Sequence, residues 1–291
     1  MRIKEIIIET ILKVSSYLTV LVTIGIIYVL LSQSLSFFKE VSIVEFLTGK
    51  QWTPLFANKH FGILPLISGT MLTTFIALSV SVPIGLTIAI YLSEYSSKKF
   101  KKIVKPLLEV LAAVPTVVYG FFALMVVTPF LQQFIPSLAG FNSLSAGLVM
   151  GIMIIPFVSS LSEDALTAVP NSLREASYGL GSNKFQTAFK VVLPAAASGV
   201  IISIILAFSR AVGETMIVSI AAGQQPRLTA NPLVPIETIT GYVVQVCLGD
   251  VPHGSLEYKT IFAAGLTLFV ITYLLNNLSF WLKKRYQEVY E

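Results

Sequence analysis

Long apolar runs alternate with short polar segments along this chain of 291 residues. A helix needs about 20 consecutive apolar residues to cross the hydrocarbon core of a bilayer, so such runs predict membrane spans. Prolines inside some runs are compatible with spans, because neighbouring helices can satisfy the carbonyls that a proline frees. The pattern predicts an all-α, polytopic membrane protein with six transmembrane helices, at residues 14–31, 63–92, 103–131, 143–161, 195–223 and 258–282.

The first run resembles a signal peptide only superficially. Its apolar core is longer than usual, two acidic residues precede it and no small-residue cleavage pattern follows, so we expect a retained span. Residues 1–13 place isoleucines at helical spacing among charged residues, which predicts a short amphipathic helix at the membrane surface. We divide the chain into an N-terminal part with the first span and an external loop (1–62), a transmembrane domain (63–282) and a tail (283–291).

The polar segments differ in charge. The stretch S-S-K-K-F-K-K-I-V-K at 96–105 predicts a dense basic loop, whereas 32–62 and 224–257 predict longer mixed loops. If both termini lie inside, 14 Lys and Arg fall on the cytoplasmic side and 5 outside, with one more within the fifth run. Positive residues are enriched in cytoplasmic segments, so this excess predicts that both termini and residues 170–194 are cytoplasmic.

Composition agrees with a membrane protein and argues against several other classes. The chain is 55% hydrophobic and 12% charged, with a mean hydropathy of +0.81, whereas soluble domains carry about 25% charged residues. The net charge of +5 comes from basic residues beside the apolar runs, so we predict a lipid bilayer as a partner and no nucleic acid. The single cysteine, Cys247, excludes an internal disulfide, and two distant histidines argue against a metal site.

The cytoplasmic segment is the longest helix-compatible polar stretch between two apolar runs. Gly179 and Gly181 stand where a helix would stop and turn, since glycine adopts left-handed backbone at low cost. Ser182 or Asn183 can cap a following helix, and Pro194 can occupy the first turn of the next one. We therefore predict a helix, a sharp turn and a second helix between two spans.

This segment resembles the EAA loop of ABC importer permeases. The family pattern is E-A-A, three residues, G, nine residues, I-x-L-P; here Glu175-Ala176 is followed by Ser, three residues, Gly181, nine residues and V-V-L-P. The loop of that family docks into a groove on the cytoplasmic ATPase. The resemblance implies that Arg174, Glu175, Ala176 and Gly181 couple this chain to an ATPase, and the alternative is an ordinary polar connection between two spans.

Arg210 and Glu214 form a charged pair deep within the fifth apolar run. A charge near the bilayer centre costs at least about 2.5–3.5 kcal/mol on insertion scales, so it is expected to have a partner or a function. Residues four apart share a helix face. In one interpretation the pair is purely structural; in the other, Arg210 offers its guanidinium fork to a tetrahedral oxyanion, and Glu214 holds it when no anion is present. Thr215 completes the candidate substrate pathway.

The segment R-A-V-G-E-T-M at 210–216 also resembles the permeases of phosphate-specific ABC importers. The stretches W-T-P, F-G-I-L-P-L-I-S-G-T, I-Y-L-S-E-Y and V-P-T-V-V-Y-G-F-F are similar to the same family and favour its PstC type over the PstA type. The resemblance covers nearly the whole chain after residue 45. It implies the type I ABC importer (MetI-like) permease fold, a prokaryotic plasma membrane location, and import of inorganic phosphate.

The resemblance also implies partners: a second permease subunit of the PstA type, two copies of an ABC ATPase subunit and an external phosphate-binding protein. No G-x-x-x-x-G-K-[ST] phosphate loop occurs, so we expect no enzyme activity and no bound cofactor here, with ATP and Mg used by the ATPase. Alternatives are another oxyanion (sulfate, molybdate or phosphonate), a stand-alone secondary transporter, which predicts an internal repeat, and an intramembrane enzyme using Glu214, for which a second catalytic group is missing.

Overall fold

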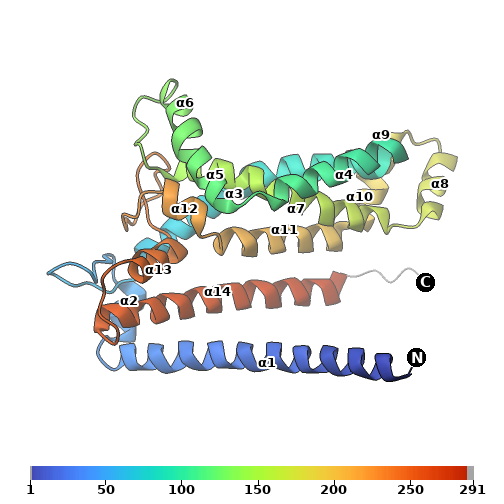
Figure 1. The fold of residues 1–291 in the computed structure, drawn as a ribbon. Coiled ribbons are helices and arrows are strands. Elements are labelled where there is room, and N and C mark those ends of the chain that lie inside the picture. The colour runs from blue at the N-terminus through green and yellow to red at the C-terminus, as the bar shows by residue number, and fades with distance from the viewer. Residues whose placement is uncertain (1, 287–291) are drawn as a thin grey trace.

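The computed structural model describes residues 2–286, most of which are helical (Figure 1). Within that part of the chain, extended pairing is limited to two isolated bridges, Trp52 with Phe61 and Gly223 with Ile236. The all-α prediction is therefore confirmed.

The long helices lie along a common direction, and α1 begins at the end of the molecule where α14 finishes (Figure 1). Three π-helical turns, at Tyr91–Tyr95, Ala123–Val127 and Ala188–Val192, continue α3, α5 and α9. The helices are α1 (Arg2–Phe38), α2 (Ile43–Thr48), α3 (Leu64–Ile90), α4 (Lys98–Ala113), α5 (Thr116–Phe122), α6 (Thr128–Gln132), α7 (Ser143–Thr167), α8 (Asn171–Gly179), α9 (Lys184–Thr187), α10 (Leu193–Ala195), α11 (Ala197–Val212), α12 (Met216–Ala221), α13 (Ile239–Leu248) and α14 (Leu256–Tyr286).

Up to six segments are long and apolar enough to cross a membrane, in agreement with the six-span prediction. Four are single helices in α1, α3, α7 and α14, and the other two are bent pairs. Lys98–Ala113 and Thr116–Gln132 meet at 81°, and Lys184–Ala195 and Ala197–Val212 meet at 72°. The first bend falls before Pro115, because proline disfavours helical backbone at the preceding residue, and Val114 is extended (φ −62°, ψ 130°).

The N-terminal amphipathic helix expected at 1–13 is not a separate element. Helix α1 runs without interruption from Arg2 to Phe38 and includes the first span. No glycine or proline precedes Gly25, so nothing in the sequence stops the helix at the start of the apolar run. The prediction of a separate interfacial helix is wrong.

Two segments expected to be loops contain helices. Most of the basic stretch 96–105 forms the first turns of α4, which begins at Lys98. The helix is capped by Ser97, whose hydroxyl accepts a hydrogen bond from the backbone N–H of Phe100 at 3.3 Å. The segment 224–257 contains α13, which is capped by the Thr238 hydroxyl. Local capping, which the apolar pattern does not report, therefore converts both loops into helices.

Helices α3 and α7 form the most extensive helix–helix contact in the described chain. Gly147 and Gly151 make the close approach possible, since small residues let neighbouring helices pack tightly. An added Cβ would lie 2.7 Å from the Ile76 side chain at the first position and 2.8 Å from the Ala77 carbonyl oxygen at the second. This pair is the scaffold on which the other helices pack.

An aromatic cluster fixes the end of the molecule opposite the start of α1 (Figure 1). Phe37, Phe46, Trp52 and Tyr242 are almost fully buried there. Successive ring centroids lie 5.8, 6.1 and 5.0 Å apart in edge-to-face contacts, which are favourable aromatic arrangements. The cluster joins the end of α1 to α2, the following loop and α13.

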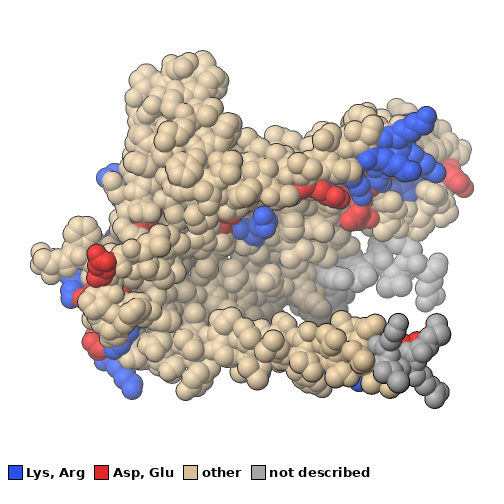
Figure 2. Space-filling view, viewed as in Figure 1, with Lys and Arg blue, Asp and Glu red and all other residues tan. Residues whose placement is uncertain are grey.

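Charged side chains are concentrated toward the ends of the long helices. Figure 2 shows the largest group of Lys and Arg at the end where α4 begins and α8 lies. The last span ends at Leu282 as predicted, but helix α14 continues beyond it to Tyr286. Part of the predicted tail, 283–291, is thus helical, and residues 287–291 lie outside the described chain.

Candidate functional site

The fifth apolar run is broken between α11 and α12. Residues 213–215 separate the two helices, and Glu214 is 9% exposed. Its Oε1 accepts hydrogen bonds from the backbone N–H groups of Met216 at 3.1 Å and Ile217 at 3.4 Å. These amides belong to the first turn of α12, where helical N–H groups have no partner inside the helix. The Glu214 carboxylate therefore caps α12.

Arg210 does not form the predicted ion pair with Glu214. The arginine lies in the last turn of α11 and is exposed. Among the ion pairs of the described residues, none joins these two side chains. The prediction that Glu214 holds Arg210 is wrong for this structure, because the helix that would align residues four apart ends at Val212.

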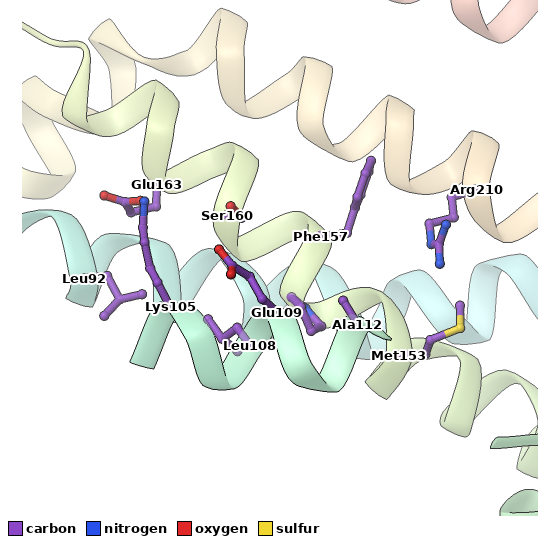
Figure 3. A pocket seen from close by; sticks show the side chains of 11 residues that line it. Leu92, Lys105, Leu108, Glu109, Ala112, Met153, Phe157, Ser160, Glu163 and Arg210 are labelled. Atoms are coloured by element: carbon purple, nitrogen blue, oxygen red, sulfur yellow. The ribbon is translucent and has the colours of Figure 1, made fainter. Parts of the chain in front are cut away.

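Arg210 faces a cavity of about 330 Å³ between α4, α7 and α11. Figure 3 shows Arg210 at one end of the cavity, and Lys105 and Glu163 at the other. Apolar side chains form most of the wall between them. The lining residues are Leu92, Lys105, Leu108, Glu109, Ala112, Met153, Pro156, Phe157, Ser160, Glu163 and Arg210.

The charges at the far end of the cavity largely neutralise one another. The Glu163 side chain is 1% exposed and forms ion pairs with Lys101 and Lys105 of α4. The Thr167 hydroxyl donates a further hydrogen bond to it at 2.9 Å. Arg210 forms no ion pair or hydrogen bond with any described residue, so its five N–H donors are available to a ligand.

Thr215 does not share this cavity. It lines a separate cavity of about 290 Å³, together with Thr240 and apolar residues of α13 and α14. Glu214 lines neither of the two cavities, although the Thr240 hydroxyl donates a hydrogen bond to its backbone oxygen at 2.6 Å. Of the three predicted pathway residues, only Arg210 reaches the cavity between α4 and α7.

Residues 170–194 form the predicted helix, turn and helix. Gly181 has φ +85°, the left-handed conformation that glycine adopts most readily. Its N–H donates to the Tyr178 oxygen and the Ser182 N–H to the Ser177 oxygen, which is the Schellman arrangement that ends a helix. Asn183 then begins the next helix in a reciprocal capping box with Gln186. Together these contacts set the sharp turn.

Pro194 lies in the first turn of α10 (Leu193–Ala195), the position predicted for it. Helix α10 directly continues the helical path that starts at Lys184, and the bend follows at Ala196. The preceding π-helical turn, Ala188–Val192, lets the proline sit inside a continuous helical path.

The predicted coupling residues divide between two faces of α8 and its turn. Glu175, Ala176 and Gly181 are exposed, as is Leu180 at 89%. Arg174 is different: its side chain is 13% exposed and pairs with Glu94 at the end of α3. The exposed face can receive a partner, whereas Arg174 contacts the rest of this chain.

Sequence reasoning overlooked several charged residues of the site. Glu94 lies just beyond the second apolar run, and Glu163 lies near the end of the fourth. A carboxylate that is 5% exposed or less, near an apolar run, needs a cationic partner. The sequence offered one signal, a carboxylate next to an apolar run, whereas its burial and the identity of its partner depended on the fold.

Several apolar segments able to cross a membrane, together with a cavity between them that contains an unpaired arginine, are typical of a polytopic membrane transport protein. Residues 81–288 match the family described as "Binding-protein-dependent transport system inner membrane component". The chain belongs to this family, and it is a multi-pass permease subunit of the inner membrane rather than an ATPase.

Curated relatives share about a third of their residues with this chain. The "Probable ABC transporter permease protein YqgH" of Bacillus subtilis is 36% identical over 245 residues, covering 84% of this chain and 79% of the relative. The "Phosphate transport system permease protein PstC" of Mesorhizobium japonicum is 34% identical over 250 residues, covering 79% and 75%. The PstC protein of Pasteurella multocida is also 34% identical, covering 81% and 78%.

Solved structures of ABC importers have the same fold. The bacterial alginate ABC transporter in complex with a pentasaccharide-bound periplasmic protein matches with a TM-score of 0.63 and 16% identity, covering 97% of this chain and 96% of the other. The inward-facing MetNI methionine ABC transporter matches with a TM-score of 0.57 and 16% identity, covering 78% and 95%. The predicted MetI-like permease fold is confirmed.

Proposed function

We propose that this chain is the PstC-type permease subunit of an ABC importer for inorganic phosphate, driven by ATP hydrolysis in partner subunits. The observation that carries the proposal is the unpaired guanidinium of Arg210 in a cavity between membrane spans. The names of relatives at about a third identity support phosphate as the cargo.

Arg210 is suited to bind a tetrahedral oxyanion. A planar guanidinium fork can donate two parallel hydrogen bonds to two oxygens of one anion. At about 4 Å and an effective dielectric constant of about 20, one pair of unit charges interacts by about 4 kcal/mol. Glu214 and Thr215 act differently in this proposal, since they shape the break between α11 and α12 rather than contact the anion.

The proposed assembly contains a PstA-type permease subunit, two ATPase subunits and an external phosphate-binding protein. The exposed residues Glu175, Ala176, Leu180 and Gly181 suit a docking face for the ATPase. The ATPase subunits bind ATP and Mg, and this chain binds no cofactor. The start of α1 and the end of α14 lie at the same end of the molecule as α8, and this end is cytoplasmic in the proposed arrangement (Figure 1).

The test is uptake of labelled phosphate by the reconstituted complex with Arg210→Gln. About 1.4 kcal/mol of activation free energy corresponds to a tenfold change in rate. Losing the contact is therefore expected to lower uptake about a hundredfold or more. The matched control is Arg227→Gln, which alters an exposed arginine hydrogen-bonded to Gln225 in the loop before α13. Normal uptake by the Arg210 variant, at equal amounts of complex, would contradict the proposal.

Competition distinguishes the cargo. An excess of unlabelled phosphate is expected to abolish uptake of the label, whereas sulfate, molybdate and phosphonate are expected to compete weakly. If one of these anions is taken up in preference to phosphate, the chain is still a permease subunit, but phosphate is not its cargo.

A further inference from the structure

The side chain of Arg174 is enclosed between three elements of this chain. Its Nη2 lies 2.8 Å from Oε1 of Glu94, and its Nε lies 3.2 and 3.3 Å from the two oxygens of the same carboxylate. The Glu94 side chain is 5% exposed and that of Arg174 is 13% exposed. The two groups therefore form a two-pronged, largely desolvated ion pair, which fixes direction as well as distance.

The guanidinium of Arg174 also donates to two backbone carbonyls, and its Nη1 lies 3.5 Å from Oδ1 of Asn171. Nη2 donates to the oxygen of Leu166 at 2.9 Å, and Nη1 donates to the oxygen of Val169. Leu166 is in the last turn of α7, and Val169 follows that helix. Carbonyls at a helix end lack partners inside the helix and favour a cation. Arg174 thus contacts the end of α7 and the end of α3 simultaneously.

The position of Glu94 strengthens the connection to α3. It lies in the π-helical turn Tyr91–Tyr95, which continues α3 without a break. Helices α3 and α7 form the most extensive contact in the described chain and both belong to the membrane-crossing scaffold. Arg174 of α8 therefore contacts the ends of α3 and α7, the two helices that would have to move if the membrane region changed shape.

We propose that the Arg174–Glu94 pair is the joint through which movement of α8 reaches α3 and α7. This inference rests on the proposed coupling to an ATPase and assigns a separate role to each face of α8. The outer face, with Glu175 and Leu180, receives the partner. Arg174, on the inner face, is a positioning residue that transmits the displacement. Loss of the joint lets α8 move without moving the spans.

The role predicts uncoupling rather than loss of assembly. In Arg174→Gln and Glu94→Gln, the apolar contacts of Leu173 with the cluster at the end of α3 and α7 remain and keep α8 in place. The ATPase subunits then still bind and hydrolyse ATP, but the number of phosphate ions moved per ATP falls. Arg174→Lys is expected to behave similarly, because one ammonium cannot reproduce a fork that reaches both a carboxylate and two carbonyls.

The experiment compares purified complexes in proteoliposomes, measuring labelled phosphate uptake, ATP hydrolysis and the amount of ATPase subunit that copurifies. Arg174→Gln and Glu94→Gln are expected to lower phosphate moved per ATP at least tenfold with unchanged copurification. Glu175→Lys, on the outer face, is expected to lower copurification instead. The matched control is Glu9→Gln, which breaks an ion pair with Lys13 whose side chains are 65% and 66% exposed.

A covalent substitute for the pair separates a joint from a merely structural contact. Glu94→Cys with Arg174→Cys, in a Cys247→Ser background, is expected to regain coupling when a short bis-maleimide links the two thiols. Wild-type uptake of phosphate tests the proposed function by itself, and the ratio of variant to wild type tests the joint. An unchanged ratio in both Gln variants, loss of copurified ATPase, or a linked protein that remains uncoupled would overturn the inference.

Discussion

The carboxylate of Glu214, at the break between α11 and α12, binds backbone N–H groups and not the Arg210 side chain. Glu214 accepts hydrogen bonds from two backbone N–H groups in the first turn of α12. This side chain therefore defines where the second helix of the fifth apolar run starts. Arg210, at the last turn of α11, is left without a protein partner among the described residues. The break thus produces the free guanidinium on which the proposed transport role depends.

Glu214→Gln is expected to keep most of the phosphate uptake, since the amide oxygen can still accept the hydrogen bonds from Met216 and Ile217. Glu214→Ala removes the cap and is expected to cost about 1 kcal/mol of stability, with a larger loss of uptake. The two variants are compared by phosphate uptake and by the temperature of thermal unfolding. If Glu214→Gln lowers uptake as much as Glu214→Ala, the negative charge of Glu214 is required. That result would support a transient contact between Glu214 and Arg210.

Glu237, between α12 and α13, predicts a pH dependence of stability. The residue is 2% exposed, and burial raises its pKa from 4.5 to about 8. A carboxyl with a raised pKa holds its proton more tightly in the folded state. Its contribution to stability is complete below pH 4.5 and is lost as the pH rises to about 8. Each pKa unit corresponds to about 1.4 kcal/mol.

Glu237→Gln, which cannot ionise, is expected to remove this loss. In detergent, the unfolding temperature of the wild type should fall relative to that of the variant between pH 4.5 and about 8. The two proteins should then differ most at the alkaline end of the window. Parallel curves across that range would show that Glu237 does not titrate with a raised pKa.

At the scale of elements, the turn between α8 and α9 depends on one backbone conformation. An added Cβ at Gly181 meets no atom within 4 Å, so space is available. The constraint is the backbone itself, because φ +85° is strained for any residue with a side chain. The exposed surface on either side of the turn, which we propose as the docking face, keeps its shape only while this conformation persists.

Gly181→Ala is therefore expected to cost about 1–2 kcal/mol locally and to reduce both bound ATPase and phosphate uptake. Gly179→Ala is the matched control, since Gly179 lies in α8, has open space around its Cα and lacks a positive φ. Alanine there is expected to be neutral or slightly stabilising. Copurification of the ATPase measures both. Equal effects of the two substitutions would exclude the left-handed turn as the cause.

For the whole molecule, the arrangement of the ends predicts topology. The start of α1, the end of α14 and helix α8 lie at one end, and α2 and α13 lie at the other (Figure 1). Lys and Arg are gathered most densely at the first of these ends (Figure 2). Since positive residues remain cytoplasmic, we place that end inside the cell.

Single cysteines at Lys99, Lys184, Lys50 and Arg227, in a Cys247→Ser background, test this orientation with an impermeant thiol reagent on intact cells. Labelling is expected at Lys50 and Arg227 only, and at the other two positions after permeabilisation. The reverse pattern would invert the topology, and labelling of all four in intact cells would contradict a six-span arrangement.

Local pattern alone was enough to predict the class, the number of spans and the sharp turn at Gly181, because run length and glycine chemistry depend on neighbours in sequence. It did not predict the break at 213–215 or the helical start of α4, since capping competes with hydrophobic periodicity. The Arg174–Glu94 contact joins residues 80 positions apart. Only tertiary packing decides such a pairing, because a buried charge selects its partner from whatever groups the folded helices bring within reach.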